Sequence, residues 1–409
     1  MALPVLYPIT MQANMGATQL AGSINAGESS ACRAMNVLVY VHMRNIYRST
    51  GAGRVARQLI EHLAKRQGIN IHILADQSDY RSVIDKVGAP WTDYQYHFFT
   101  KDTGIQQRQW LILHSPKAES FWPEAQIVHC TGESYVPRSR ARLIVTVHDA
   151  AYFDASAHPK NWATVKQSLK WRVLYATLSR TASLFHTVSH FSADRLAAVF
   201  PDIRSRLRVI HNAAHPRFFG AVSDVGTEFL ARHGLSGKPY ILVPGGLQYR
   251  KNAELVLKAW PILAERFPDF TLIVAGHCDP RLVGAALALG KSVLLTGFVE
   301  DDELHALYHG SRVVWFPSRY EGFGMPVLEA MASGAAVVSS NSTSIPEVAG
   351  DAALLVDPRS LDDNIGALEA VIRDEQLRAS LRGRGKVRAQ GFTWGVSAAR
   401  LQDLYSEVL

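Results

Sequence analysis

Two glutamates eight residues apart, Glu321 and Glu329, are the strongest candidates for functional residues in this sequence. They lie in VVWFPSRYEGFGMPVLEAMASG, in which a strand-like run is followed by a glycine-containing loop and a helical pattern. Pro326 suits the first turn of that helix, because its missing N–H would be unpaired there, and Gly334 suits its end. We therefore expect Glu321 in a loop and Glu329 inside a helix, with both carboxylates reaching one ligand. Alternatively, Glu321 is a solvated charge in the loop, and Glu329 only stabilises the dipole of its helix.

Two neighbouring cations, Arg250 and Lys251, form a second candidate site. The segment VPGGLQYRKN runs from a strand through the turn at Gly245 and Gly246 to these cations, and a helix is expected from about Asn252. Positive charge at a helix N-terminus, where backbone N–H groups are free, suits a diphosphate. Solvated surface cations are the alternative.

Glycines also stand before the first expected helix. Gly51, Gly53 and Ala56 match the dinucleotide pattern G-x-G-x-x-A, and Asp76 ends the next expected strand. That pattern needs its first glycine directly after a strand, whereas residues 42–50 intervene here. The glycines can still offer backbone N–H groups to an anion, and a simple flexible loop is the alternative.

A further candidate, His148, lies with Asp149 at the end of the run Thr146-Val147. The carboxyl end of a strand is the functional position in parallel α/β sheets. A histidine satisfied within the core is the alternative.

Short runs rich in Val, Ile and Leu alternate with helical patterns, so we expect parallel sheets with crossover helices. The first series of expected strands is 37–41, 71–75, 127–130, 143–147, 184–188 and 208–210. Helices are expected between them at 53–66, 160–180 and 192–199. The second series of strands is 240–243, 270–275, 293–296, 313–316, 336–339 and 353–356. The fold class is therefore α/β, with two doubly wound, Rossmann-like domains facing a cleft and a linker within 211–238.

The distribution of charge and the number of cysteines indicate which partners and which cellular compartment are compatible with this sequence. Residues 35–220 contain 24 Lys and Arg against 13 Asp and Glu, whereas residues 221–409 contain 18 against 22. A basic first half indicates an anionic partner or merely scattered solvating charge. The three cysteines, Cys32, Cys130 and Cys278, are far apart and predict neither a disulfide framework nor a metal site, but a reducing compartment such as the cytoplasm. No apolar run approaches the roughly 18 residues of a spanning helix.

Taken together, these motifs resemble a retaining glycosyltransferase of family 4 with the GT-B fold. The resemblance extends over nearly everything after residue 35, and its most specific part is the spacing of Glu321 and Glu329. Supporting segments are the Gly51–Gly53 loop, His148-Asp149, TVSHFSADRL (187–196), VIHNAAHPRF (209–218), Arg250-Lys251-Asn252 and SIPEVAGDAALLVDP (344–358).

The resemblance implies a role for each candidate residue. Glu321 would contact the donor sugar, Glu329 its ribose, and Lys251 with Arg250 the diphosphate. His148 would lie near the transferred sugar and Val299 near the base. The other implied donor-binding residues are Gly51, Gly53, Gly245, Gly246, Gly322, Phe323, Gly324 and Met325. Many family members carry Arg after the first glycine of the Gly245-Gly246 pair, which would leave the phosphate charge here to Arg250 and Lys251. No metal or cofactor is expected, since no Asp-x-Asp pair stands where a metal-dependent transferase would hold Mg²⁺.

The implied domains are an N-terminal disordered extension (1–34), an acceptor-side domain (35–220), a nucleotide-sugar domain (221–395) and a C-terminal helix (396–409) that packs back on the first domain. Met35 is the expected natural start or the first ordered residue, because residues 1–34 are rich in Gly, Ala, Ser and Asn and the first expected strand follows directly. The opening MALPVLYPIT lacks the basic region of a signal peptide.

The overall similarity to bacterial mannosyltransferases of surface polysaccharide assembly implies GDP-mannose as donor and a glycan or lipid-linked acceptor. A UDP-sugar-dependent transferase, a GT-B epimerase, a dehydrogenase and a nucleic-acid binder are the competing interpretations, although no stacking-aromatic module supports the last.

We also expect peripheral attachment to the inner face of an anionic membrane. Its basis is the basic first domain and one helix that carries Lys160, Lys166, Lys170, Arg172 and Arg180 with Trp162, Trp171, Leu174 and Tyr175. The alternative is that the apolar side of this helix packs on the sheet.

Overall fold

The computed structural model describes residues 34–47, 51–154, 157–159 and 161–409. Residues 34–409 form one compact unit. The expected extension over 1–34 lies outside the described residues except for Ala34, as do Ser49, Thr50 and Lys160.

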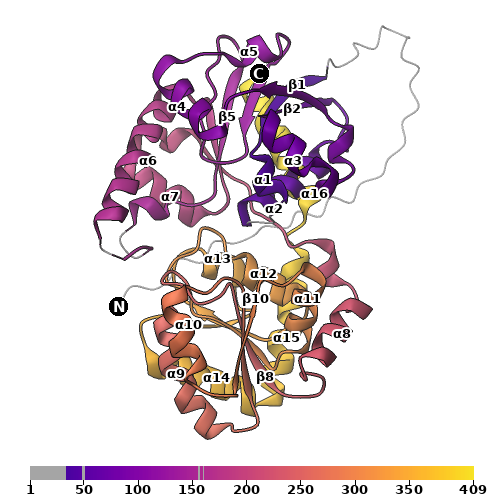
Figure 1. Ribbon diagram of the computed structural model, residues 1–409, viewed down its shortest axis with the longest axis vertical. Coiled ribbons are helices and arrows are strands. Elements are labelled where there is room, and N and C mark those ends of the chain that lie inside the picture. The colour runs from indigo at the N-terminus through magenta and orange to yellow at the C-terminus, as the bar shows by residue number, and fades with distance from the viewer. Residues whose placement is uncertain (1–33, 48–50, 155–156, 160) are drawn as a thin grey trace, which may run out of the picture. The chain divides into compact units, whose positions relative to one another are not determined.

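The first half of the chain builds a seven-stranded parallel sheet in the order β3-β2-β1-β4-β5-β6-β7 (Figure 1). Its strands are β1 (Met35–Tyr40), β2 (Ile69–Asp76), β3 (Gln95–Phe99), β4 (Ile127–Cys130), β5 (Arg142–Val147), β6 (Leu184–Thr187) and β7 (Leu207–Val209). The central strands β4 and β6 are buried along their whole length, because crossover helices cover both faces of a parallel sheet.

The second half builds a six-stranded parallel sheet in the order β10-β9-β8-β11-β12-β13, which is the doubly wound order of dinucleotide-binding folds. Its strands are β8 (Tyr240–Pro244), β9 (Thr271–Ala275), β10 (Val293–Gly297), β11 (Val313–Phe316), β12 (Val337–Ser340) and β13 (Leu354–Val356). Two parallel sheets of this kind confirm the predicted α/β fold of two Rossmann-like domains.

Helices connect successive strands on both sheets. Those of the first half are α1 (Met43–Tyr47), α2 (Gly51–Leu63), α3 (Gln77–Val87), α4 (Thr103–Leu113), α5 (Ala118–Phe121), α6 (Trp162–Thr181) and α7 (His190–Val199). Those of the second half are α8 (Asp224–Arg232), α9 (Ala253–Arg266), α10 (Pro280–Leu287), α11 (Asp301–Gly310), α12 (Met325–Ala332), α13 (Ile345–Ala349), α14 (Leu361–Arg373), α15 (Glu375–Gln390) and α16 (Trp394–Val408).

The last helix, α16, returns to the first sheet. It packs on α2 (Figure 1), and its Tyr405 hydroxyl forms a buried 2.7 Å hydrogen bond with Nδ1 of His129 on β4. The helix α8 lies within the expected linker 211–238 and packs on α11, so that stretch is partly helical.

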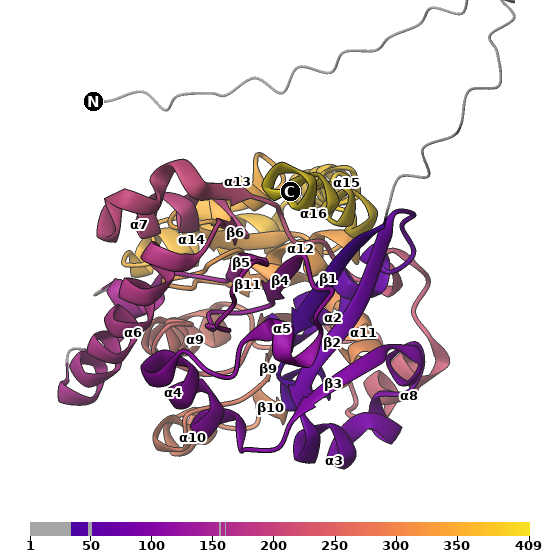
Figure 2. The ribbon, with the colours of Figure 1, turned by 90° about the horizontal axis from the view of Figure 1, so that it is seen from above.

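One strand was not predicted. The edge strand β3 pairs with β2 only (Figure 2). Its sequence, QYHFF, is aromatic and mostly half-buried. This sequence lacks the run of Val, Ile and Leu that marks the other strands, including the edge strands β7, β10 and β13.

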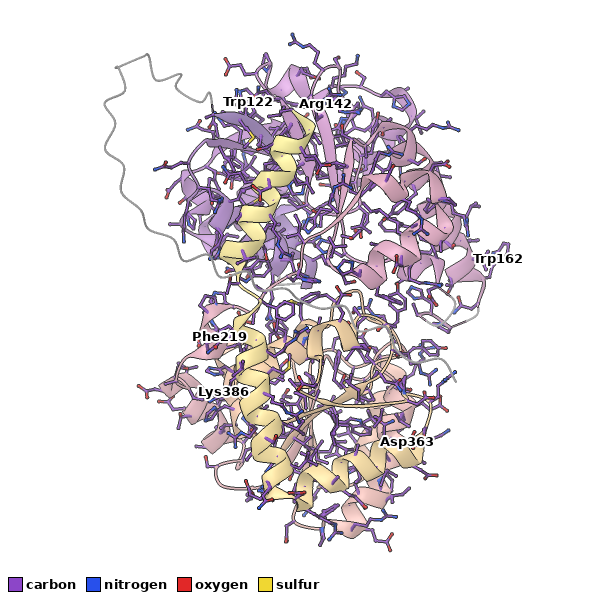
Figure 3. The ribbon with its side chains drawn as sticks, turned by 180° about the vertical axis from the view of Figure 1, so that it is seen from behind. Trp122, Arg142, Trp162, Phe219, Asp363 and Lys386 are labelled. Atoms are coloured by element: carbon purple, nitrogen blue, oxygen red, sulfur yellow. The ribbon has the colours of Figure 1, made fainter. Side chains whose placement is uncertain are left out.

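The helix α6 is apolar on two opposite faces, and the prediction assigned these faces wrongly. Leu174 and Tyr175 are buried against the first sheet, and Trp171 stacks on Tyr152 with ring centroids 4.7 Å apart, so these three side chains face inward. Of the four apolar residues expected on the outer surface, Trp162 alone lies there, and Figure 3 shows its side chain standing out from the helix.

Candidate active site

A cavity of about 350 Å³ lies where the strands of both sheets end. This volume is within the usual range for small-molecule sites. The predicted site residues that line it are Gly51, His148, Gly245, Arg250, Lys251, Val299, Glu321, Gly322, Phe323, Gly324, Met325 and Glu329. Gly53 instead borders a neighbouring hollow, and Gly246 lies in the turn behind the cavity wall. The structure thus brings residues from five separate segments to one place.

The centre of the cavity holds an ion pair between two predicted residues. The Lys251 ammonium donates to Oε1 of Glu321 at 2.6 Å, and the Ser318 hydroxyl donates to the same oxygen at 2.6 Å. The ammonium also lies 4.7 Å from the centroid of the Phe316 ring on β11. The loop after β11 and the turn before α9 therefore position these two side chains against each other.

Burial and charge act in opposite directions on this pair. Burial lowers the pKa of Lys251, and the facing Glu321 carboxylate offsets part of that loss. For Glu321, burial would raise the pKa, but Lys251 and Arg250 outweigh it and hold the pKa below its usual value. Glu321 is consequently a carboxylate at neutral pH, next to two cations that can face a further anion.

Arg250 joins the two sheets. Its guanidinium pairs with Asp149 at 3.1 Å, just beyond the end of β5, while its backbone carbonyl accepts from the Arg319 N–H at 2.8 Å. Close to this pair, a Cβ atom on Gly322 would lie 2.1 Å from the His148 carbonyl oxygen. Only glycine allows the loop of Glu321 to approach β5 so closely.

Position 246 also requires glycine, because of its backbone conformation and its close neighbours. Gly246 has φ +77°, and a Cβ atom there would lie 1.9 Å from the carbonyl oxygen of His277. The arginine that many family members carry at this point has no room in this turn. Arg250 and Lys251 are the cations that remain beside it in the cavity.

Glu329 lies one turn inside α12 and is buried. Its Oε2 accepts from the Tyr308 hydroxyl at 3.2 Å, and its Oε1 lies 3.7 Å from Nη1 of Arg54. Burial raises the pKa of Glu329 to about 7, with Arg54 opposing the shift and Asp301 adding to it. The two glutamates therefore differ in pKa, although they line the same cavity.

His148 lies between this cavity and a hollow of about 200 Å³ within the first sheet's half. Its Nε2 is 2.9 Å from the Thr131 carbonyl oxygen, and its backbone N–H donates to Glu133 at 2.7 Å. The hollow is lined by His42, Glu133 and Ser134. Burial raises the pKa of the Glu133 carboxyl group. A polar hollow next to the main cavity can take a second substrate.

Comparison with known proteins places this geometry in a family. Residues 49–218 match the family described as Glycosyltransferase Family 4, and residues 227–388 match the one described as Glycosyl transferases group 1. O-antigen chain mannosyltransferase B of Escherichia coli is 30% identical over 267 residues, which are 64% of this chain and 69% of that protein. The chain belongs to glycosyltransferase family 4. The serotype-specific mannosyltransferase WbdA of E. coli is 34% identical over 167 residues, which are 39% of this chain and 20% of that larger protein.

Solved structures share the GT-B fold with this glycosyltransferase. Sucrose-phosphate synthase from Thermosynechococcus elongatus superposes with a TM-score of 0.72 at 17% identity, over 91% of this chain and 99% of its own. Anabaena HepE, in complex with UDP and glucose, superposes with a TM-score of 0.68 at 16% identity, over 91% and 100%.

Several residues of the glycosyltransferase site were not predicted from its sequence. Ser189 and Ser192 are two of them, and their hydroxyls donate to the Gly322 carbonyl at 2.6 and 3.0 Å, which holds the two sheets together. Asp149, which was expected beside His148 at the end of its strand, pairs with Arg250. Arg54 and Tyr308 flank Glu329. Asp76 caps α3 through the N–H groups of residues 78 and 79, a structural role that replaces the one in the dinucleotide pattern.

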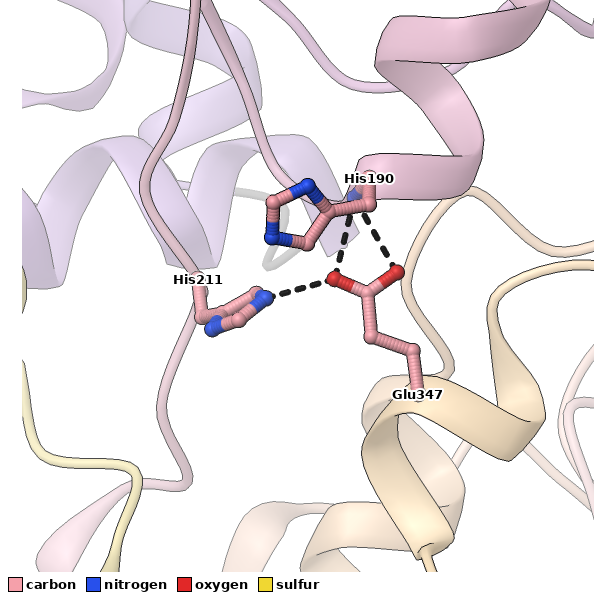
Figure 4. A group of neighbouring side chains, drawn as sticks. All are labelled: His190, His211 and Glu347. Carbon is pink, nitrogen blue, oxygen red and sulfur yellow. Dashed lines mark hydrogen bonds and ion pairs between the residues drawn. The ribbon is translucent and has the colours of Figure 1, made fainter. Parts of the chain in front are cut away.

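Among the described residues, one group of three side chains, His190, His211 and Glu347, brings metal-ligand atoms within 4.8 Å of one another (Figure 4). Glu347 already accepts from the His190 N–H at 2.9 Å and from His211 Nε2 at 2.6 Å. Because Glu347 belongs to α13 and His190 begins α7, the carboxylate ties the second sheet's half to the first through the free amides of a helix start.

Proposed function

We propose that this glycosyltransferase moves mannose from GDP-mannose to a lipid-linked or polysaccharide acceptor with retention of configuration. The observation that carries the proposal is the buried Lys251–Glu321 pair at 2.6 Å beside Arg250, in one cavity with Glu329. The names of the two mannosyltransferase relatives support the choice of sugar, acceptor and surface glycan assembly.

The cations act on the leaving group in this proposal. Breaking the anomeric C–O bond places new charge on the departing diphosphate, and Lys251 and Arg250 stabilise that charge more in the transition state than in the ground state. The acceptor hydroxyl attacks from the same face as the departing phosphate. The proton of that hydroxyl passes to the phosphate oxygen as the new glycosidic bond forms.

Each carboxylate has its own task. Glu321 accepts hydroxyl hydrogen bonds from the donor sugar, and Glu329 accepts them from the ribose. The base lies against Val299 and Leu304 at the far end of the cavity. The hollow lined by Glu133 and Ser134 takes the acceptor, so that His148 lies between the two substrates.

A donor panel tests the assignment. The thermal shift of the protein should be largest with GDP-mannose among GDP- and UDP-sugars, and radiolabelled mannose should pass to a polysaccharide or lipid-linked acceptor. A larger shift and transfer with a UDP-sugar would replace the proposed donor. Interconversion of nucleotide-sugars without acceptor would instead support the GT-B epimerase.

Metal independence is a separate part of the proposal. Arg250, Lys251 and the amides at the start of α12 together supply positive charge without a bound ion. Transfer activity should therefore be unchanged in excess EDTA. Loss of activity in EDTA with recovery on adding Mg²⁺ would contradict it.

We also propose that the outer face of α6 attaches the enzyme to the inner surface of an anionic membrane. Four large apolar side chains are exposed along one face of this helix, at 70% for Trp162, 54% for Val165, 64% for Leu169 and 58% for Val173. They recur at three- and four-residue spacing, and Lys166, Lys170 and Arg172 are exposed beside them. An apolar stripe between cations has the chemistry of a helix that lies in a lipid–water interface.

No helix among the described residues is long and apolar enough to span a bilayer. Each cation near the surface contributes about 1 kcal/mol, so the attachment should be reversible and sensitive to salt. Sedimentation with vesicles of phosphatidylglycerol tests it, with phosphatidylcholine vesicles as control. Trp162→Ser with Leu169→Ser should abolish co-sedimentation, whereas Ile112→Ser, on exposed α4, should not. Equal binding to both vesicle types would contradict the proposal.

A further inference from the structure

We propose that Arg54 is a positioning residue that keeps the Glu329 carboxylate ionised for the ribose and so couples donor binding to the first sheet's half. This inference rests on the ribose-binding role proposed for Glu329. Arg54 comes from α2 beside the first sheet, whereas Glu329 comes from α12 beside the second.

The guanidinium of Arg54 reaches two carboxylates of the other half. Its Nη2 lies 2.5 Å from Oδ1 of Asp301, the first residue of α11, and its Nη1 lies 3.7 Å from Oε1 of Glu329. It lines both the main cavity and an adjoining hollow of about 200 Å³. Arg54 therefore stands between Glu329 and the rest of the first half.

The hydrogen-bonding capacity of this guanidinium is not used up. The Nε atom of Arg54 is buried without a hydrogen-bond partner among the described residues. The 3.7 Å approach to Glu329 is an attraction between charges and is too long for a hydrogen bond. The contact can therefore influence whether Glu329 is ionised. Because it forms no hydrogen bond with Glu329, both carboxylate oxygens can still accept hydrogen bonds from the two hydroxyls of a ribose.

Among the charged groups around Glu329, Arg54 does most to lower the pKa of its carboxyl group. The groups that face it are Arg54, Asp301, Tyr308 and Lys251, with Arg217 and His215 behind Asp301. Burial, the largest effect, raises the pKa of Glu329 to about 7; among the groups that oppose this, Arg54 has the largest effect. Without Arg54, the Asp301 carboxylate would repel an ionised Glu329, so the pKa of Glu329 would rise further.

Nucleotide affinity as a function of pH tests the inference, with GDP and UDP as probes measured by calorimetry between pH 6 and 9. The wild-type affinity should be constant above about pH 8 and fall as the pH drops through the Glu329 pKa of about 7. In Arg54→Gln the fall should begin at higher pH, and a rise of one unit in the pKa of Glu329 should weaken binding about fivefold at pH 7, where half of the wild-type carboxyls are ionised. Arg54→Lys should keep most of the wild-type profile.

Two controls separate this role from others. Arg57 lies one turn further along α2 and pairs with Glu61 at 2.9 Å, so Arg57→Gln should leave the profile unchanged. In a Glu329→Gln background, Arg54→Gln should have no further effect on the pH profile. A wild-type profile in Arg54→Gln, or an equal loss in both backgrounds, would overturn the inference while leaving the ribose role of Glu329 intact. Unchanged affinity in Glu329→Gln would instead remove that role, and the inference with it, without touching sugar transfer.

Discussion

At the scale of single residues, the two glutamates of the cavity are prepared differently. Both are buried, but cations hold the pKa of Glu321 below the usual value, whereas burial outweighs the nearby cations at Glu329 and raises its pKa to about 7. Buried charge of this kind is retained at functional sites although it lowers stability. The cost should be measurable in the unliganded enzyme.

Glu329→Gln should stabilise the unliganded protein at alkaline pH. The pKa is about 7 in the folded state against 4.5 for an unperturbed glutamate, so the folded state loses stability as pH rises from about 4.5 to 7. Removing this charge should recover up to about 3 kcal/mol at pH 8. The melting temperature of the variant should exceed that of the wild type at pH 8, and the two should converge near pH 4.5. A difference that does not change with pH would contradict the assignment.

Lys251→Ala should reduce transfer more than Arg250→Ala. Lys251 is the more deeply buried of the two and is the direct partner of Glu321, so its loss leaves Glu321 with a longer-range cation alone. Loss of one buried charged partner costs about 3–5 kcal/mol in stability, so kcat should be compared at temperatures where circular dichroism shows both variants folded. Greater activity in Lys251→Ala than in Arg250→Ala would reverse their roles.

The residues that carry an unusual local signature could be predicted. Glu321 and Glu329 stand in a strand-loop-helix pattern, and Lys251 follows a glycine turn. Arg54 and Tyr308 could not be predicted, because their importance lies in the partners that face them across the cavity. Nothing within a few positions of Arg54 indicates Asp301, which is more than 240 residues away.

At the scale of elements, the approach of the Glu321 loop to β5 depends on Gly322. A methyl group there would overlap the His148 carbonyl oxygen and lie 2.6 Å from the Asp149 side chain. The same loop receives the Ser189 and Ser192 hydroxyls from the start of α7.

Gly322→Ala should therefore separate the loop from β5 without unfolding either sheet. Transfer activity should fall by at least about tenfold, because small displacements in an active site cost that much or more, while the circular dichroism spectrum is unchanged. Gly366→Ala, on α14, is a matched control, since a Cβ atom there meets nothing within 4 Å. Equal activity of both variants would show that the close approach is not needed for transfer.

The strands predicted from the sequence carry short runs rich in Val, Ile and Leu, and they include the partly exposed edge strands β7, β10 and β13. The unpredicted β3 is an edge strand, and its sequence carries no such run. The outward face of α6 was assigned to the wrong residues for a related reason. Apolar residues lie on both of its sides, so periodicity alone does not say which side meets the sheet.

At the scale of the whole molecule, Glu347 holds α7 to the second half. Its pKa is lowered, because the His211 ring and the backbone N–H groups of His190 and Phe191 outweigh burial. The stability that it contributes is present above the unfolded pKa of 4.5 and is lost as pH falls through its lower folded pKa.

Glu347→Ala should cost about 1–2 kcal/mol, the range of other helix-capping side chains. Hydrogen exchange should rise at residues 190–192, and urea unfolding at pH 7 should show the loss of stability. Asp351→Ala, an exposed acid on the loop after the same helix, should change neither quantity. An unchanged exchange rate at the start of α7 would contradict the role of Glu347.

The return of α16 to the first sheet means that the two halves of the enzyme are not two consecutive stretches of chain. The half built around β8–β13 is an insertion between β7 and α16, and the buried contact between Tyr405 and His129 closes the first half around that insertion. A chimaera that takes its donor specificity from a relative must accordingly be joined at two points, before α8 and before α16. A single crossover would pair α2 and β4 with a foreign final helix, whose side chains need not fit the groove that Tyr405 fills.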